Sequence, residues 1–367
     1  MAAHGYLVYL LRINKPYRNK VLQRLSSAGD NGDDLLQLIG ARLEELGHSF
    51  YRDDKTSEGF RVKEVVRAGR AVYVRFNKGP SGSPGETFDE ETQESVETTE
   101  RQALLSGLRA FLVVPTDSYY GLLFVEKIGR RHLKEVLTEV AIKPAGERSG
   151  VVMRIESFAE LKDWEAELGQ KQVLVVSELL VPTSSGEDAS TPDDSTVTVT
   201  ATGGRVRGVT ERLQGVLSKR LTGREKRLDD LATASGLERK RVAEPDAFTV
   251  QDAQELEEAT LRVVDAEKAP AVDPELKAAL DGLVPADRGG LAHKRYEVSV
   301  GERRVERTFV IESDAVPQFT YQLGARLEDD ALVKVWKQHA LGILKNRRVQ
   351  LPGDWDKDPA PAEKPQG

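Results

Sequence analysis

The five histidines are the first side chains that could carry chemistry, as metal ligands or general bases. They are His4, His48, His132, His293 and His339, and they form neither an HExxH motif nor a pair at the spacing of metal ligands. The chain has no cysteine, which excludes disulfides, thiolate nucleophiles and iron–sulfur clusters. We therefore expect no catalytic residue, no metal site and no cofactor.

Carboxylates and glycines give no stronger catalytic signal. The run Asp30-Asn31-Gly32-Asp33-Asp34 lacks the ligand spacing of a calcium loop and its closing glutamate, so we interpret it as a turn and a helix cap. No phosphate-binding glycine loop is followed by Lys-Ser/Thr, and Gly203-Gly204 is better explained as a hairpin turn. A nuclease without a recognisable motif stays an alternative.

Charge is segregated along the chain, although its formal net charge is −7. Residues 86–100 hold seven carboxylates and no base, whereas 205–241 hold eleven bases against five acids. Residues 60–79 and 331–348 each have a local balance of +5. Basic segments of this kind are typical of nucleic-acid-binding proteins.

The basic segments define the candidate DNA-binding residues. In 205–241 they are Arg205, Arg207, Arg212, Lys219, Arg220, Arg224, Lys226, Arg227, Arg239, Lys240 and Arg241. A β-hairpin predicted at 60–76 carries Arg61, Lys63 and Arg75. The last predicted helix, which begins at 331, and the residues directly after it carry Lys334, Lys337, Lys345, Arg347 and Arg348. Such stripes contact phosphates, which carry no base identity, so we expect sequence-tolerant binding. Few aromatic residues interleave with these bases, which favours duplex over single-stranded DNA.

The segment 228–242 resembles a helix-turn-helix. Ala232 would let two helices approach, Gly236 would form the turn, and Val242 would pack the second helix, which carries Arg239, Lys240 and Arg241. Pro245 shortens that second helix. The alternative is a corner between two helices with a solvated basic face.

The elements that position these residues indicate an α+β protein with mixed sheets and helices. We predict strands at 5–13, 60–66, 71–76, 110–114, 121–125, 151–155 and 173–181, with helices at about 35–46, 130–140 and 159–167. Asp33 is the expected cap of the first helix, and 78–100 is expected to be an acidic loop insertion.

The second half repeats the mixture of strands and helices. We expect a twisted hairpin at 195–209, a mostly helical region at 211–285, strands at 296–300 and 304–312, and a helix at 331–346. This predicts two domains, 1–183 and 195–350, joined by a linker at 184–194 and followed by a disordered acidic tail at 351–367. The longest apolar run near the N-terminus, 5–11, is too short for a membrane span, so we expect a cytoplasmic protein.

The order of these segments resembles the RexA phage-exclusion proteins of lambda-type prophages. The resemblance is carried by Gly5-Tyr6-Leu7-Val8-Tyr9, by Ala68-Gly69-Arg70-Ala71-Val72-Tyr73-Val74, and by Phe111-Leu112-Val113-Val114 followed by Gly121-Leu122-Leu123-Phe124. A strand pair at 296–311 and the basic helix ending at Arg348 also match in order. The acidic run 86–100 and the acidic tail depart from that arrangement.

The resemblance implies a dimeric DNA-binding protein that senses phage DNA in an abortive-infection system and signals to a membrane partner of the RexB type. It also implies a distant likeness to the RdgC family, whose dimers surround duplex DNA. The DNA contacts named above come from local charge and not from this resemblance. The competing hypothesis is a phage or prophage scaffold protein that binds no nucleic acid.

Overall fold

The structure is a computed structural model, which describes residues 4–16, 22–47, 49–53, 58–80, 85–88, 95–98, 105–160, 162–163, 172–182, 195–199, 204–265, 278, 291–302, 305–310, 319–347, 349 and 351–357. It contains helices and antiparallel sheets, as an α+β fold requires. The chain divides into two compact units, each made of separate stretches of sequence. One unit comprises Met1–Glu156, Asp230–Val264 and Thr320–Gly367, and the other comprises Ser157–Asp229 and Asp265–Phe319.

The first unit is built on a nine-stranded sheet in the order β10-β1-β9-β8-β5-β4-β3, with β2 and β15 also pairing with β1. The strands are β1 (His4–Asn14), β2 (Leu22–Gln23), β3 (Phe50–Asp53), β4 (Glu58–Ala68), β5 (Ala71–Pro80), β8 (Ser106–Val113), β9 (Gly121–Ile128), β10 (Val152–Phe158) and β15 (Tyr321–Gln322). The predicted strand at 5–13 and the predicted 60–76 hairpin are confirmed, since β4 and β5 pair from Ala68↔Ala71 to Glu58↔Pro80.

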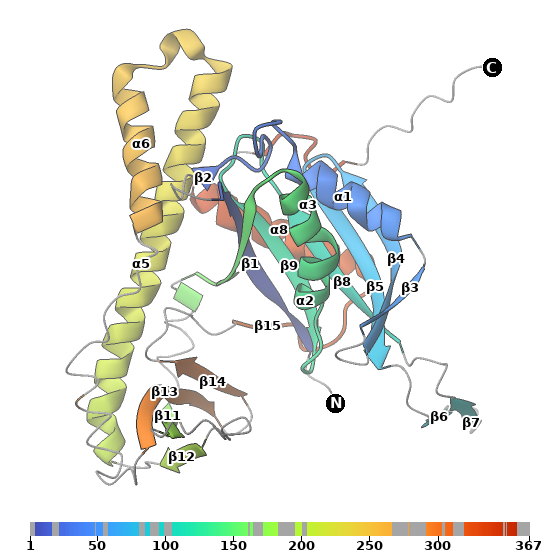
Figure 1. Cartoon of the computed structure of the whole chain (residues 1–367), viewed down its shortest axis with the longest axis vertical. Coiled ribbons are helices and arrows are strands. Elements are labelled where there is room, and N and C mark those ends of the chain that lie inside the picture. Colours follow the sequence, from blue (N-terminus) through green and yellow to red (C-terminus); the bar gives the residue numbers. More distant parts are fainter. Residues whose placement is uncertain are drawn as a thin grey trace. The chain divides into compact units, whose positions relative to one another are not determined.

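One face of this sheet is covered by helices from the first half of the chain. These are α1 (Leu35–Leu46) and the continuous run of α2 (Lys134–Leu137), the π-helical turn η1 (Thr138–Ile142) and α3 (Lys143–Arg148). Figure 1 shows these helices in front of the sheet. Alternate strand residues such as Leu7, Tyr9 and Leu11 join Ile39 and Leu43 of α1 in one buried cluster, as the period of two in a strand demands.

The opposite face is covered by α8 (Asp329–Asn346). Trp336 of α8 is fully buried, and its ring centroid lies 6.3 Å from that of Phe111 and 6.4 Å from those of Tyr6 and Phe124. The same sheet therefore has a core of mainly aliphatic side chains on the α1 face and a cluster of aromatic side chains on the α8 face.

The cap of α1 differs by one residue from the prediction. The side chain of Asp34, and not of Asp33, accepts the backbone N–H of Leu36, while Gly47 ends the helix with a φ of 53°. Asp33 is occupied instead in a backbone bridge with Ala28, which places Asp34 at the helix start.

The second unit contains a four-stranded sheet in the order β12-β11-β13-β14. The strands are β11 (Gln172–Pro182), β12 (Ser195–Val199), β13 (Leu291–Glu302) and β14 (Val305–Val310). The expected domain boundary at 184–194 is therefore corrected, because β11 and β12 lie on either side of it and pair from Val176↔Val199 to Leu180↔Ser195. Hydrogen bonding between the two flanking strands keeps both in one sheet.

Two further expectations are corrected by local pairing. In place of a loop throughout 78–100, β6 (Gly85–Phe88) and β7 (Ser95–Thr98) form a two-stranded antiparallel sheet. In place of a twisted hairpin at 195–209, β12 is followed by the 40-residue helix α5 (Gly204–Ala243). Most of the predicted helix at 159–167 lies outside the described residues, which include only 162–163 in helical form there.

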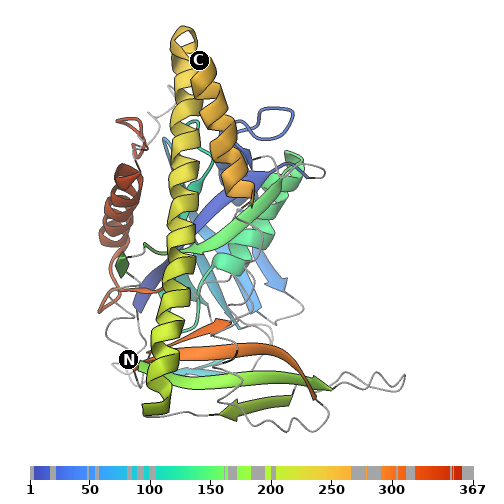
Figure 2. The ribbon, with the colours of Figure 1, turned by 90° about the vertical axis from the view of Figure 1, so that its left-hand side faces the viewer.

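Helix α5 is followed by the 3₁₀ turn η2 (Pro245–Ala247) and by α6 (Val250–Asp265), which runs back along the end of α5 in Figures 1 and 2. Arg262 of α6 bonds to Asp230 of α5 at 2.9 Å, and Asp252 bonds to Lys240 at 2.7 Å. This antiparallel pair confirms part of the helical region expected at 211–285.

The beginning of the expected disordered tail is packed against the first unit. Trp355 is 6% exposed, its ring lies 6.4 Å from that of Phe111, and its carbonyl oxygen accepts the Arg70 N–H at 2.7 Å. Gly69 permits this close approach, because an added Cβ there would lie 2.5 Å from the Asp354 carbonyl oxygen. The expectation of disorder is thus wrong for 351–357, while 358–367 lies outside the described residues.

The packing of Trp355 predicts a large loss of stability on truncation. Trp355→Ala should lower the free energy of unfolding by about 3 kcal/mol, because it removes a buried indole from an aromatic core. Phe50→Ala is the control, since that ring is 48% exposed, and it should cost less than about 1 kcal/mol. Urea unfolding followed by fluorescence measures both, and equal losses would contradict a packed C-terminal segment.

Candidate nucleic-acid interface

Helix α5 replaces the predicted helix-turn-helix. Gly236, the expected turn residue, lies inside one continuous helix that extends from Gly204 to Ala243. A glycine costs an interior helical position only about 1 kcal/mol relative to alanine, and the packing of neighbouring residues offsets this cost. Leu231 and Ser235 are fully buried on α5, so its end is fixed by tertiary contacts and no turn forms.

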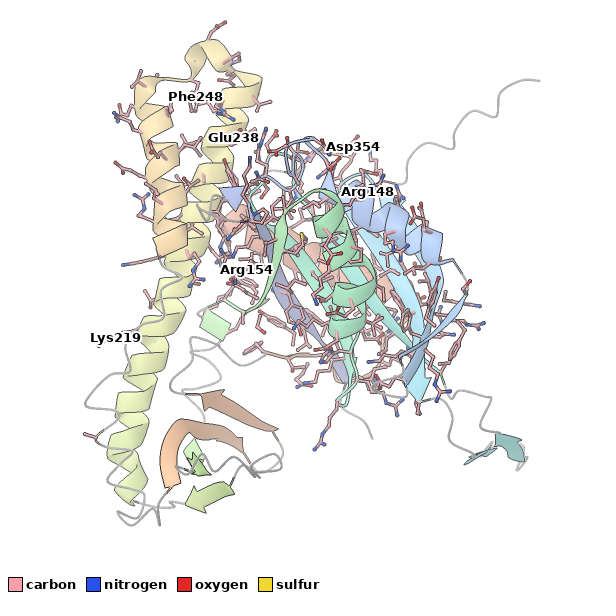
Figure 3. The ribbon with its side chains drawn as sticks, viewed as in Figure 1. Arg148, Arg154, Lys219, Glu238, Phe248 and Asp354 are labelled. Carbon is pink, nitrogen blue, oxygen red and sulfur yellow. The ribbon has the colours of Figure 1, made fainter. Side chains whose placement is uncertain are left out.

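Two buried polar side chains fix the end of α5 within the first unit, to which residues from Asp230 onward belong. Ser235 Oγ accepts the backbone N–H of Tyr119 at 3.1 Å and donates to the Leu231 carbonyl at 2.7 Å. Glu238, 1% exposed, lies 3.4 Å from Arg24 and 2.5 Å from Arg241. Burial, together with Glu238, raises the pKa of Tyr119 to about 12. Figure 3 labels Glu238 near the end of α5.

Several of the expected DNA-binding cations are engaged by carboxylates of the chain itself. Arg75 lies 3.0 Å from Asp329, Lys240 lies 2.7 Å from Asp252, and Lys337 lies 3.1 Å from Asp356. Arg241 bonds to Glu238, as described above. These four pairs reduce the charge that the cations can offer to a phosphate.

The prediction that Arg347 contacts DNA is corrected for a different reason. It is 9% exposed and donates from Nη1 to the Ile343 carbonyl at 3.3 Å, so it ends α8 and is not part of an exposed stripe. A basic residue near a helix C-terminus commonly bonds the last carbonyl groups in this way. Its neighbour Arg348 lies outside the described residues.

The remaining candidates fall into three groups. Lys63 of β4, Lys219 and Lys226 of α5, and Lys334 and Lys345 of α8 are exposed. Arg61 of β4 and Arg227 and Arg239 of α5 are half-buried. The side chains of Arg205, Arg207, Arg212, Arg220 and Arg224 lie outside the described part, although their backbone belongs to α5.

The continuity of α5 brings four bases into one line that the sequence analysis missed. Arg205, Arg212, Lys219 and Lys226 follow one another at intervals of seven residues on this helix. A straight helix drifts by only about 20° per seven residues, so the four positions lie within an arc of roughly 60°. At 1.5 Å per residue they extend over about 32 Å. We call these four positions the α5 stripe, and Figure 3 labels Lys219 on it.

A second set of charges lies on the α8 face of the large sheet. Arg109, 2% exposed, bonds to Glu126 through Nε at 2.9 Å and Nη2 at 2.6 Å, and to Asp329 through Nη1 at 2.6 Å. Arg326 adds a contact to Glu126 at 3.3 Å. Sequence reasoning missed Arg109 and Arg326, because each stands outside the three basic segments.

The pKa shifts in this set follow from its geometry. Burial alone would lower the pKa of Arg109, but hydrogen bonds to Glu126 and Asp329 raise it above its ordinary value. Burial would raise the pKa of Asp329, but hydrogen bonding and attraction from Arg109 lower it. These groups therefore stay charged at neutral pH and link the sheet to the start of α8.

Among the described residues, no three histidine or carboxylate side chains come together in a group that could hold a metal ion. In the same part of the chain, no helix combines the length and the apolar character needed to cross a membrane.

Comparison of the chain with protein-family models, with curated proteins and with solved structures found no match.

The contacts of Asp252 predict a pH-dependent opening of the α5–α6 hairpin. Hydrogen bonds, first from Lys240 and then from Thr249, lower the pKa of Asp252 to about 2. An unfolded aspartate titrates near 3.9, so the stabilisation is complete above about pH 4 and is lost as the pH falls towards about 2. Hydrogen exchange in 240–253, corrected for the intrinsic rate, should increase through this window.

Asp252→Asn should remove that pH dependence, whereas Glu255→Gln, at an exposed position of α6, should retain it. If Asp252→Asn exchanges with the same pH profile as the parent chain, another group controls the opening of the hairpin.

Proposed function

We propose that this protein binds duplex DNA without sequence preference through the α5 stripe. The observation that carries the proposal is the continuity of α5, which aligns Arg205, Arg212, Lys219 and Lys226 on one helix. Between 204 and 227 the helix holds eight bases and two acids. A local excess of this size attracts a polyanion even though the whole chain is acidic.

The length of the stripe fits a duplex. Its span of about 32 Å is close to one turn of B-DNA, about 34 Å. The four bases lie about 10 Å apart along the helix, so along one turn of duplex each can reach a different phosphate, and these phosphates are not adjacent in one strand. Phosphate contacts position a protein on DNA without reading bases, which supports sequence tolerance.

The exposed Lys334 and Lys345 of α8 are weaker candidates for DNA contact. Lys337, which lies between them, is paired with Asp356, and Arg347 is buried. Without Lys337 and Arg347, the stripe expected on α8 consists of two exposed lysines among the described residues. Two contacts give little affinity at physiological salt, so α5 leads the proposal.

The biological setting is proposed from the resemblance to RexA proteins alone. In that setting the chain would act in the cytoplasm as a homodimer that senses phage DNA and signals to a membrane partner of the RexB type. The effector of abortive infection would then be the partner.

A scaffold or interaction protein is the second candidate. The pairing of Arg75, Lys240, Arg241 and Lys337 with carboxylates favours it, since these cations then support the fold. Nucleic acid that co-purifies with the untreated protein would argue against this candidate.

The salt dependence of binding tests the leading proposal. Changing Arg205, Arg212, Lys219 and Lys226 together to Ala should make the slope of log Kobs against log salt shallower by about 3 to 4, because each phosphate contact contributes about 0.9. Alanine is the strongest helix former, so circular dichroism should show that α5 persists. Fluorescence anisotropy with duplexes of unrelated sequence measures the slope.

The control variant changes Lys143 and Arg148 to Ala, which are exposed on α3. Its slope should match that of the parent chain. An unchanged slope in the fourfold variant would refute the α5 stripe, and absence of binding at low salt would refute DNA binding altogether.

A further inference from the structure

An arginine-lined gap lies on the α8 face of the large sheet, around Gly107. Strand pairing places Arg61 opposite Asn77 and Asn77 opposite Gly107, so β4, β5 and β8 contribute one row. The adjacent row contains Arg75 opposite Arg109. Arg326, which precedes α8 in the chain, reaches the same place and donates from Nη2 to the Gly107 carbonyl at 2.6 Å.

The missing side chain of Gly107 opens a space between three polar groups. A Cβ added there would lie 3.5 Å from Arg326 Nη2, 3.6 Å from Asn77 Oδ1 and 3.7 Å from Arg75 Nε. These are ordinary van der Waals distances, so one added methyl group fits there without displacing its neighbours. Two guanidinium groups and the acceptor oxygen of Asn77 thus lie within 4 Å of one point.

Arg75 and Arg326 each use only some of their hydrogen-bond donors within the described part of the chain. Arg75 uses Nη1 for Asp329 at 3.0 Å, and Arg326 uses Nε and Nη2 for Glu126 and Gly107. In the part of the chain that the structure describes, Arg75 Nε and Nη2 and Arg326 Nη1 have no bonded partner. Their side chains are 39% and 45% exposed, so solvent and small solutes can reach them.

The local charge favours an anion. Arg109 and Glu126 neutralise each other, and Asp329 is shared by Arg75 and Arg109. The positive charges of Arg326 and Arg61 are then not balanced by these carboxylates. The opposite charges of the exposed Lys63 and Glu64, which lie nearby, cancel each other. Among the described residues, the buried Nε of Arg61 has no hydrogen-bond partner, so this donor is not saturated by that part of the protein.

We propose that Arg75, Arg326 and Arg61 form a binding site for a phosphate monoester around Gly107. Guanidinium groups match phosphate oxygens with parallel hydrogen bonds, and a terminal phosphate dianion has enough acceptors for several arginine donors. The ligand is either a free phosphate compound or the 5′-phosphate at a DNA end. The site uses no residue of the α5 stripe and so goes beyond the proposed function.

Gly107 offers a test that changes no charge. Gly107→Val fills the gap and suits a strand, whereas Gly107→Ala adds a methyl group at ordinary contact distances. Isothermal titration with inorganic phosphate, against sodium chloride of equal ionic strength, should show binding to the parent chain. Gly107→Val and Arg326→Gln should each weaken it by at least about tenfold, the cost of losing hydrogen bonds to a charged group.

Arg148→Gln, an exposed change on α3, is the matched control and should bind phosphate as the parent chain does. Equal binding by Gly107→Val and the parent chain, or no phosphate binding by the parent chain, would overturn the site. Thermal unfolding of each variant confirms that a loss reflects the gap and not a loss of fold.

Short duplexes with 5′-phosphate or 5′-hydroxyl ends separate the two ligand sources. A preference for the phosphorylated end that disappears in Gly107→Val identifies a DNA terminus. Phosphate binding without such a preference identifies a free phosphate compound. The fourfold α5 variant should still bind inorganic phosphate, so a failure of the proposed DNA function would leave this result unchanged.

Discussion

One guanidinium group connects most of the first unit. Arg109 lies almost fully buried and joins β8 to β9 through Glu126 and to the start of α8 through Asp329 and the Leu327 carbonyl. Removal of one partner from a buried pair leaves an uncompensated charge, at a cost of about 3 to 5 kcal/mol. The position of α8 over the aromatic face therefore depends on this set of charges as much as on the contacts of Trp336.

The alternation of apolar and polar residues was sufficient to predict six of the nine strands of the large sheet and the helix α1, but not the short strands β2, β3 and β15. It could not predict their partners. Arg109 and Glu126 stand in strands with mostly apolar sequence, and only the pairing of β8 with β9 puts them opposite each other. The helix-turn-helix prediction failed for a related reason, since Gly236 is a local signal and the burial of Ser235 and Glu238 is a tertiary one.

Counting charges along the sequence overestimates the cations available to DNA. Three of the four carboxylates that neutralise them lie outside the basic segments: Arg75 and Asp329, for example, are 254 residues apart, and Lys337 and Asp356 are 19 apart. Only Glu238, which pairs with Arg241, belongs to the same segment. The gap around Gly107 was equally invisible, because its residues come from β4, β5, β8 and the segment before α8. The α5 stripe is the exception, since its seven-residue spacing can be read from the sequence once a continuous helix is known.

The order in which the first unit is assembled has a consequence for its biosynthesis. Three rings of its aromatic face, Tyr6, Phe111 and Phe124, all precede residue 128, but Trp336 and Trp355 are more than 200 residues further along. A ribosome adding about 5 to 20 residues per second needs roughly 10 to 40 s to cover that distance. During this interval the apolar surface of these rings lacks the two indoles that cover it in the folded unit.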